Sequence, residues 1–227
     1  MAAARERVLA FDVNETLLDL RALDPVFERV LGAASLRPAW FATMLQVAFV
    51  GGLTGRYVDF STAQRAALSM TATRVGRDLD DAATEEVVGA MRRLPAHPEV
   101  PAALTRLREA GFRLAALSNG VLDVVEDQLR AAGLREHFAQ VRSADEVHAL
   151  KPMPSPYRLV ADRFGVPPER VRLVAAHGWD VSGALAAGCA AAFVARPGTA
   201  LIPLGPRPDV VGADLAEVAD RIVEVDG

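Results

Sequence analysis

Short apolar runs alternate with amphipathic helical patterns through most of the second half of the chain, which restricts the folds open to it. The runs read as strands are 8–13, 113–118, 138–142, 171–176 and 190–195. The stretches read as helices between them are 101–110, 121–132, 155–164 and 181–187. Glycine follows each of these stretches, where helix C-caps favour it. The alternation predicts an α/β fold, a Rossmann-like doubly wound parallel sheet with helices on both faces.

Residues 23–94 break this rhythm and read as several amphipathic helices. Gly51-Gly52 and Gly55 interrupt the region, Asp80-Asp81 begins its last helix, and the stretch 94–98 reads as a return linker. We therefore predict a core domain from 1–20 and 95–227, with a helical cap domain at 21–94. An insert after the first strand would lie over the carboxyl ends of the strands, as a lid does.

Composition narrows the classes of partner. The chain has 227 residues, of which 51% are hydrophobic, and a net charge of -4 without a basic block, so neither nucleic acid nor a membrane is expected as a partner. Its one cysteine, Cys189, excludes an internal disulfide and reads as a small core residue. The amino terminus leads directly into the first strand without a signal peptide. These features predict a cytoplasmic protein.

Asp12 closes the first apolar run and is followed by a polar turn that includes Thr16. A carboxylate at the end of a buried strand offers an oxygen nucleophile at the sheet edge where open α/β folds bind ligands. The alternative from these residues alone is an Asp that caps the next turn.

Three further groups lie at predicted strand ends or helix starts. Ser118 and Asn119 precede a helix and could form an anion site or an ordinary N-cap. Lys151 precedes a proline and could be either a functional cation or a solvated surface residue. The stretch His177-Gly178-Trp179-Asp180 could be functional or a helix cap with a packing Trp.

Taken in order, Asp12 with Thr16, Ser118, Lys151 and Asp180 resemble the four motifs of the haloacid dehalogenase superfamily, and the resemblance covers the whole chain. Within it the chain looks most like the type II 2-haloacid dehalogenases. The stretches that carry this likeness are 11–19, 56–60, 117–120, Lys151-Pro152 with Tyr157, and 179–184.

The resemblance implies a hydrolase of short 2-substituted carboxylates. Asp12 would attack the substrate carbon, form an ester and be released by water. Lys151 would keep Asp12 ionised, Ser118 with the neighbouring helix N–H groups would hold the substrate carboxylate, and Asp180 would position or deprotonate the water. Other residues are expected to contact the substrate: Asn14, Phe41, Phe60, Asn119, Tyr157, His177 and Trp179. Because Trp179 and Phe60 are apolar, they would supply a dry wall.

Asn14 stands where phosphatases of the superfamily carry a second Asp, which serves as general acid and helps to bind Mg²⁺. An amide cannot serve as a general acid at neutral pH, and the fourth motif offers Asp180 without another carboxylate nearby. We therefore expect neither a metal nor another cofactor. A phosphohydrolase, or a scaffold without turnover, remains a weaker alternative.

Four residues depart from the 2-haloacid enzymes. Phe41 aligns with the cap Arg that receives the halide, and Ala175, His177 and Asn14 replace Ser, Asn and Tyr. Arg37 lies one helical turn before Phe41 and could reach the same place. These departures leave open another leaving group, such as fluoride or the ring amine of azetidine-2-carboxylate. His177 could protonate that group or orient Asp180.

The family resemblance also suggests a homodimer formed through cap helices. Two other histidines, His97 in the linker and His148, read as structural or solvated residues.

Overall fold

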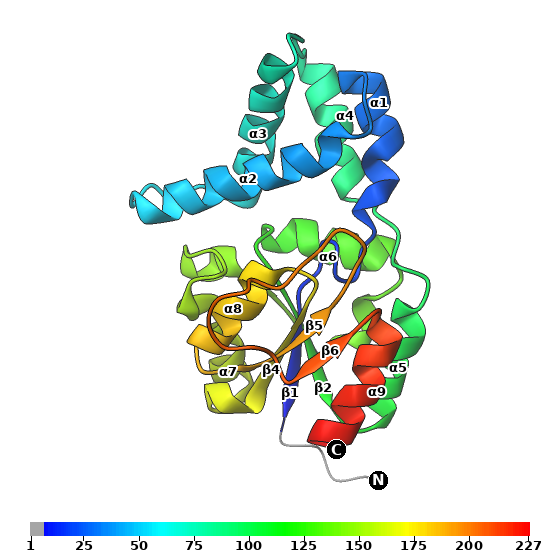
Figure 1. Cartoon of the computed structure of the whole chain (residues 1–227), viewed down its shortest axis with the longest axis vertical. Coiled ribbons are helices and arrows are strands. Elements are labelled where there is room, and N and C mark those ends of the chain that lie inside the picture. The colour runs from blue at the N-terminus through cyan, green and yellow to red at the C-terminus, as the bar shows by residue number, and fades with distance from the viewer. Residues whose placement is uncertain (1–6) are drawn as a thin grey trace.

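The computed structural model describes residues 7–227, and its centre is a parallel sheet of six strands (Figure 1). The strands are β1 (Val8–Phe11), β2 (Arg113–Ser118), β3 (Gln140–Ser143), β4 (Val171–Ala175), β5 (Ala190–Val194) and β6 (Val210–Gly212). Their order across the sheet is β3-β2-β1-β4-β5-β6. Since β1 pairs with both β2 and β4, the winding reverses at β1, and the crevice for a ligand opens at its carboxyl end.

Helices cover both faces of the sheet, as the alternation predicted. Side chains of α5 (Val100–Glu109), α6 (Leu122–Ala131) and α9 (Leu215–Asp226) join one buried cluster, and those of α7 (Pro154–Phe164) and α8 (Gly178–Ala186) join the other. Strand β1 contributes side chains to both clusters, because Leu9 and Phe11 point to the first and Val8 and Ala10 to the second. The predicted α/β class is confirmed.

Four helices between β1 and α5 form a group apart from the sheet, on the side of the strands' carboxyl ends (Figure 1). They are α1 (Asp24–Leu31), α2 (Leu36–Leu53), α3 (Phe60–Arg74) and α4 (Asp81–Met91). Asp80 caps α4 by accepting a hydrogen bond from the N–H of Ala83. The prediction that the last helix of this region begins at Asp80-Asp81 is therefore confirmed. The predicted interruption at Gly51-Gly52 is wrong, because both residues lie inside α2. The domain boundaries at 20/21 and 94/95 stay a prediction.

The glycines predicted to end helices behave as expected. Gly111, Gly133, Gly165 and Gly188 have φ between 66° and 92°, the left-handed conformation that closes a helix at little cost. Four short 3-10 helices complete the secondary structure of the described chain: Leu20–Leu23, Arg135–His137, Ala144–Val147 and Pro168–Arg170.

Cys189 is buried, and burial raises the pKa of its thiol to about 11, consistent with a small core residue. Within residues 7–227, no helix is both long and apolar enough to cross a membrane. The sequence-based statement about a signal peptide rests partly on residues 1–6, which lie outside the described part of the chain.

Candidate active site

Asp12 lies one residue beyond β1, at the point where the winding of the sheet reverses. Its N–H donates to the carbonyl of Val174 at 3.0 Å, which continues the β1–β4 ladder and fixes the residue in the crevice. The hydroxyl of Thr16 donates to Asp12 Oδ2 at 2.6 Å and accepts from the N–H of Ala176 at 2.9 Å. The carboxylate is therefore anchored by the sheet and by the turn that follows it.

Lys151 lies fully buried between two carboxylates. Its Nζ donates to Asp12 Oδ1 at 2.9 Å, to Asp180 Oδ2 at 2.6 Å and to the carbonyl of Leu117 at 2.9 Å. These bonds use all three ammonium protons. The structure thus brings together Asp12, Lys151 and Asp180 from three separate segments, and a solvated surface position for Lys151 is excluded.

Tyr157 holds the far side of this network. Its hydroxyl donates to Asp180 Oδ1 at 2.6 Å, and Asp180 is 0% exposed. Gly183 permits this approach of α7 to α8, because a Cβ at that position would stand 2.6 Å from the Tyr157 hydroxyl oxygen. Both carboxylate oxygens of Asp180 are consequently engaged, one by Lys151 and one by Tyr157.

The network favours the ionised form of Asp12. Burial opposes ionisation, but the Lys151 ammonium and the hydrogen bonds from His177 and Thr16 outweigh it and hold the pKa of Asp12 well below its usual value. Burial also opposes the charge on Lys151, yet the neighbouring carboxylates of Asp12 and Asp180 raise the pKa of Lys151 above normal. A buried carboxylate kept anionic in this way can act as a nucleophile.

Ser118 and Asn119 shape the loop after β2. Ser118 Oγ accepts from the N–H of Gly120 at 3.0 Å, within the loop before α6. The N-cap of α6 is Val121, which makes no side-chain cap bond, so the alternative that Ser118 is an ordinary N-cap is wrong. The Ser118 hydroxyl has a proton that it can donate to a ligand. The side chain of Asn119 accepts from the N–H of Lys151 at 2.8 Å and donates to its carbonyl at 3.2 Å. Asn119 therefore holds Lys151 in place, and its predicted contact with substrate stays a prediction.

Asn14 is buried two residues after Asp12, and its Oδ1 accepts from Gln128 Nε2 at 3.1 Å. Gln128 also donates to the carbonyl of Met91 at 2.8 Å, which links α6 to the end of α4. The amide oxygen of Asn14 is thus bonded to a side chain of α6.

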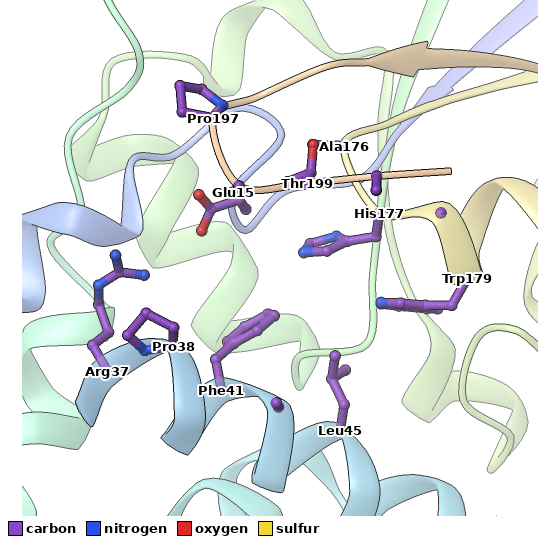
Figure 2. A pocket seen from close by; sticks show the side chains of 14 residues that line it. Glu15, Arg37, Pro38, Phe41, Leu45, Ala176, His177, Trp179, Pro197 and Thr199 are labelled. Atoms are coloured by element: carbon purple, nitrogen blue, oxygen red, sulfur yellow. The ribbon is translucent and has the colours of Figure 1, made fainter. Parts of the chain in front are cut away.

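A cavity of about 340 Å³ lies between α2 and the turn that follows β4, and an aromatic stack forms part of its wall (Figure 2). The His177 ring lies between Phe41 and Trp179, with ring centroids 5.5 Å and 5.3 Å away, and all three line the cavity. His177 Nδ1 is 3.1 Å from Asp12 Oδ2. The side chain of His177 therefore bonds to Asp12, whereas Asp180 meets His177 through the backbone, where its N–H donates to the His177 carbonyl at 3.1 Å. The expected role of His177 in orienting Asp180 stays a prediction.

Glu15 and Arg37 lie at the opposite end of this cavity from Trp179 (Figure 2). Glu15 has φ 64°, an uncommon value for a residue with a side chain, and burial raises the pKa of its carboxyl group. Arg37 Nε is paired with Asp24 Oδ1 at 2.6 Å, so this guanidinium is held within the cap. Phe60 is buried in the main core cluster and is not among the residues that line the cavity.

Sequence reasoning missed two residues that support the site. Arg196 follows β5 and donates to the carbonyl of Thr16 at 2.8 Å, while its other nitrogen pairs with Glu99 at 2.6 Å. Gln128 lies on the buried face of α6. A basic residue directly after a strand end was a usable signal for Arg196, whereas Gln128 carried none. His97 has the predicted structural role, since its Nε2 bonds to the carbonyl oxygen of Glu15 at 3.0 Å.

Comparison of the sequence with known families and proteins supports the resemblance inferred from the motifs. The model of the haloacid dehalogenase-like hydrolases matches residues 6–188. Haloacetate dehalogenase H-2 of Moraxella sp. is 33% identical over 219 residues, which are 96% of each chain. The (S)-2-haloacid dehalogenase of Pseudomonas fluorescens is 30% identical over 94% of this chain and 95% of its own.

Solved structures of L-2-haloacid dehalogenases have the same fold as this chain. The L-2-haloacid dehalogenase of Xanthobacter autotrophicus superposes with a TM-score of 0.90 at 28% identity, covering 96% of this chain and 98% of its own. A second structure of that enzyme, with chloropropionic acid covalently bound, has a TM-score of 0.89 over the same shares. The resemblance inferred from the motifs is confirmed, and the chain belongs to the family of haloacid dehalogenase-like hydrolases.

Proposed function

We propose that the protein cleaves the carbon–halogen bond of short 2-halocarboxylates by hydrolysis. Asp12 attacks the carbon that bears the halogen, halide departs, and water cleaves the resulting ester to regenerate Asp12 and release a 2-hydroxycarboxylate. The observation that carries the proposal is the buried Lys151 ammonium bonded to Asp12 and Asp180, because it keeps an oxygen nucleophile ionised in a crevice.

The cavity beside His177 bears on the leaving group. Phe41 occupies the cap position predicted to lack an Arg, and it lies in the wall of the cavity with His177 and Trp179. A dry aromatic wall strengthens the electrostatic interactions around Asp12. The relatives named above are dehalogenases of haloacetate or of 2-haloacids, which disfavours ring opening and phosphate release and makes chloroacetate and 2-chloropropionate the first substrates to test.

The test is halide release from chloroacetate and from each enantiomer of 2-chloropropionate, measured by ion chromatography with and without EDTA. We expect turnover of at least one substrate, production of the matching hydroxy acid, and no loss of rate in EDTA, because Asn14 is an amide engaged with Gln128. Hydrolysis of phosphate esters that requires Mg²⁺, in the absence of halide release, would contradict the proposal.

We also propose that two copies associate through α2 and that the protein acts in the cytoplasm. The carboxyl-terminal part of α2 extends beyond the other helices (Figure 1) and leaves Leu53 88% exposed and Val50 51% exposed. Beside them lies an apolar cavity of about 290 Å³ lined by residues that include Phe49, Leu150 and Met153. Exposed apolar patches of this kind favour association between chains.

Sedimentation velocity tests the dimer. We expect the unmodified protein to sediment as a dimer and Leu53→Lys to sediment as a monomer, since the new charge would be buried in the interface. Leu204→Lys is the matched control, because Leu204 is 77% exposed in the loop before β6, and it should leave the dimer intact. A monomeric unmodified protein would refute the association.

A further inference from the structure

The two carboxylate oxygens of Asp12 carry different numbers of hydrogen bonds. Oδ2 accepts from the Thr16 hydroxyl at 2.6 Å and bonds to His177 Nδ1 at 3.1 Å. Oδ1 accepts from Lys151 Nζ at 2.9 Å. Each oxygen of a carboxylate has two lone pairs that can accept a hydrogen bond. Among the described residues, both lone pairs of Oδ2 are therefore engaged, and Oδ1 keeps one that is open.

This difference identifies the oxygen that attacks the substrate. Attack on carbon uses a lone pair, and Oδ1 can supply one while it keeps its bond to Lys151. Attack by Oδ2 would require Thr16 or His177 to give up its bond. Oδ1 therefore becomes the bridging oxygen of the ester, and Oδ2 becomes the carbonyl oxygen.

The second step places a negative charge on that carbonyl oxygen. When water attacks the carboxyl carbon of Asp12, the electron pair of the C=O bond moves to Oδ2. Enzymes stabilise such a charge with donors held about 2.7–3.1 Å from the oxygen before the reaction begins. Thr16 Oγ1 at 2.6 Å and His177 Nδ1 at 3.1 Å already lie close to this range.

Both groups are donors toward Oδ2. The pKa of Asp12 is held well below its usual value, chiefly by the Lys151 ammonium acting against burial, so the carboxylate is ionised and can only accept. Nδ1 of His177 must therefore carry the proton of their hydrogen bond. The Thr16 oxygen accepts from the N–H of Ala176 at 2.9 Å, which leaves its own proton directed at Oδ2.

The His177 donor is fixed by its ring and by its backbone. The ring stacks against Phe41 at 18° and Trp179 at 27°, and the His177 carbonyl accepts from the N–H of Asp180 at 3.1 Å as the N-cap residue of α8. The side chains of His177 and Asp12 are 11% and 7% exposed. A donor that is held in place and shielded from water stabilises a developing charge most strongly.

We propose that the Thr16 hydroxyl and the His177 Nδ1–H form an oxyanion hole for hydrolysis of the Asp12 ester. The assignment rests on the proposed function, because it concerns the second step of that reaction. It gives His177 a role beside the two that the sequence left open. The 2-haloacid dehalogenases have Asn at this position, and an Asn amide nitrogen is bonded to Cγ, as Nδ1 of a histidine is.

The atoms and protons balance while both donors keep their protons. Asp180, the base that the family resemblance implies, takes one proton from water, and the hydroxide bonds to the Asp12 carboxyl carbon. The charge on Oδ2 returns to the C=O bond as the bond from that carbon to Oδ1 breaks. Oδ1 leaves with the substrate and takes the proton from Asp180 to form the 2-hydroxycarboxylate. The new carboxyl group of Asp12 then loses its proton to solvent.

Two substitutions of His177 distinguish a donor from a packing residue. His177→Leu keeps an apolar side chain between the Phe41 and Trp179 rings but removes the N–H. His177→Asn packs less well against those rings, yet its amide nitrogen can take the place of Nδ1. Each variant is mixed with chloroacetate in a rapid-quench apparatus, halide is counted, and the intact protein is weighed by mass spectrometry.

We expect His177→Leu to release a burst of halide equal to its active sites and then to turn over slowly, with a carboxymethyl group on the peptide that carries Asp12. Ester hydrolysis should slow by roughly 10²–10³-fold, the usual cost of removing one oxyanion-hole donor. Because the first step is unaffected, kcat and KM should fall together and kcat/KM should hold. His177→Asn should recover most of the lost rate.

A second variant tests the other donor. Thr16→Val removes the hydroxyl at nearly the same side-chain shape and should slow the same step. His137→Leu is the matched control for the histidine substitution, because His137 lies in the short helix Arg135–His137 before β3, the strand at one edge of the sheet. Both of its steps should be unchanged. Thermal melting verifies that each variant is folded.

Three results would overturn the assignment. Ester hydrolysis at the unmodified rate in His177→Leu would show that the N–H is dispensable. A slower burst of halide, without accumulation of the ester, would place His177 in the first step. Good activity in His177→Leu with loss in His177→Asn would assign the residue to packing. If the unmodified protein releases no halide from any 2-haloacid, the proposed function itself fails, a result that is distinguishable because no variant is involved.

Discussion

Replacing Asp12 with Asn should abolish halide release, lowering kcat by roughly 10⁴-fold or more, as removal of other catalytic nucleophiles does. The amide is nearly the same size and can still accept from the Thr16 hydroxyl, so the fold around β1 should persist. What is lost is the anionic oxygen that Lys151 keeps ionised. Ion chromatography of halide over many enzyme equivalents measures the effect.

The matched control for this variant is Asp127→Asn on α6, which removes a surface carboxylate paired with Arg92. Its activity should be unchanged. Residual turnover in Asp12→Asn above about one hundredth of the unmodified rate, in freshly prepared protein without deamidation, would argue against Asp12 as the nucleophile.

Replacing Lys151 with Met should remove activity and also destabilise the fold by about 3–5 kcal/mol, because two buried carboxylates lose their shared cation. Asp12 is 5% exposed and Asp180 is 0% exposed, so water cannot easily take the place of the ammonium. Lys151 is the largest of the influences that lower the pKa of Asp12, and burial acts in the opposite direction. The pKa of Asp12 should therefore rise when Lys151 is removed. Urea unfolding followed by circular dichroism measures the change in the free energy of unfolding.

Arg65→Met provides the comparison for stability. Arg65 pairs with Glu85 on the surface, with 43% and 61% of their side chains exposed, and exposed pairs contribute only about 0–1 kcal/mol. The loss in Lys151→Met should therefore be several times larger. Equal effects of the two substitutions would mean that the carboxylates of the site rearrange to reach solvent.

The repeating βα units were predictable because each was marked twice, by an apolar run and by a glycine at the helix end. Strand β2 was placed at its observed bounds, and β1, β4 and β5 differ by one or two residues at their carboxyl ends. Strand β6 and helix α9 were missed. Four prolines between residues 197 and 208 obscure the pattern before β6, and that strand is only three residues long.

Within the site, the motif residues were predictable, but their hydrogen-bond partners were not. Spacing along the chain indicates that Asp12, Lys151 and Asp180 lie at strand ends, which places them at one edge of a parallel sheet. It carries no information on side-chain direction, so the bond from Tyr157 to Asp180 and the bond from His177 to Asp12 required the structure.

The central claim is that an ester on Asp12 lies on the reaction path, and a single turnover in ¹⁸O-labelled water tests it most directly. Excess enzyme is reacted with chloroacetate, digested and analysed by mass spectrometry. If water cleaves the ester at the Asp12 carboxyl carbon, one ¹⁸O atom enters the peptide that carries Asp12 and the hydroxy acid remains unlabelled. If instead the label enters the hydroxy acid and the peptide stays unlabelled, water attacks the substrate directly and Asp12 is not the nucleophile.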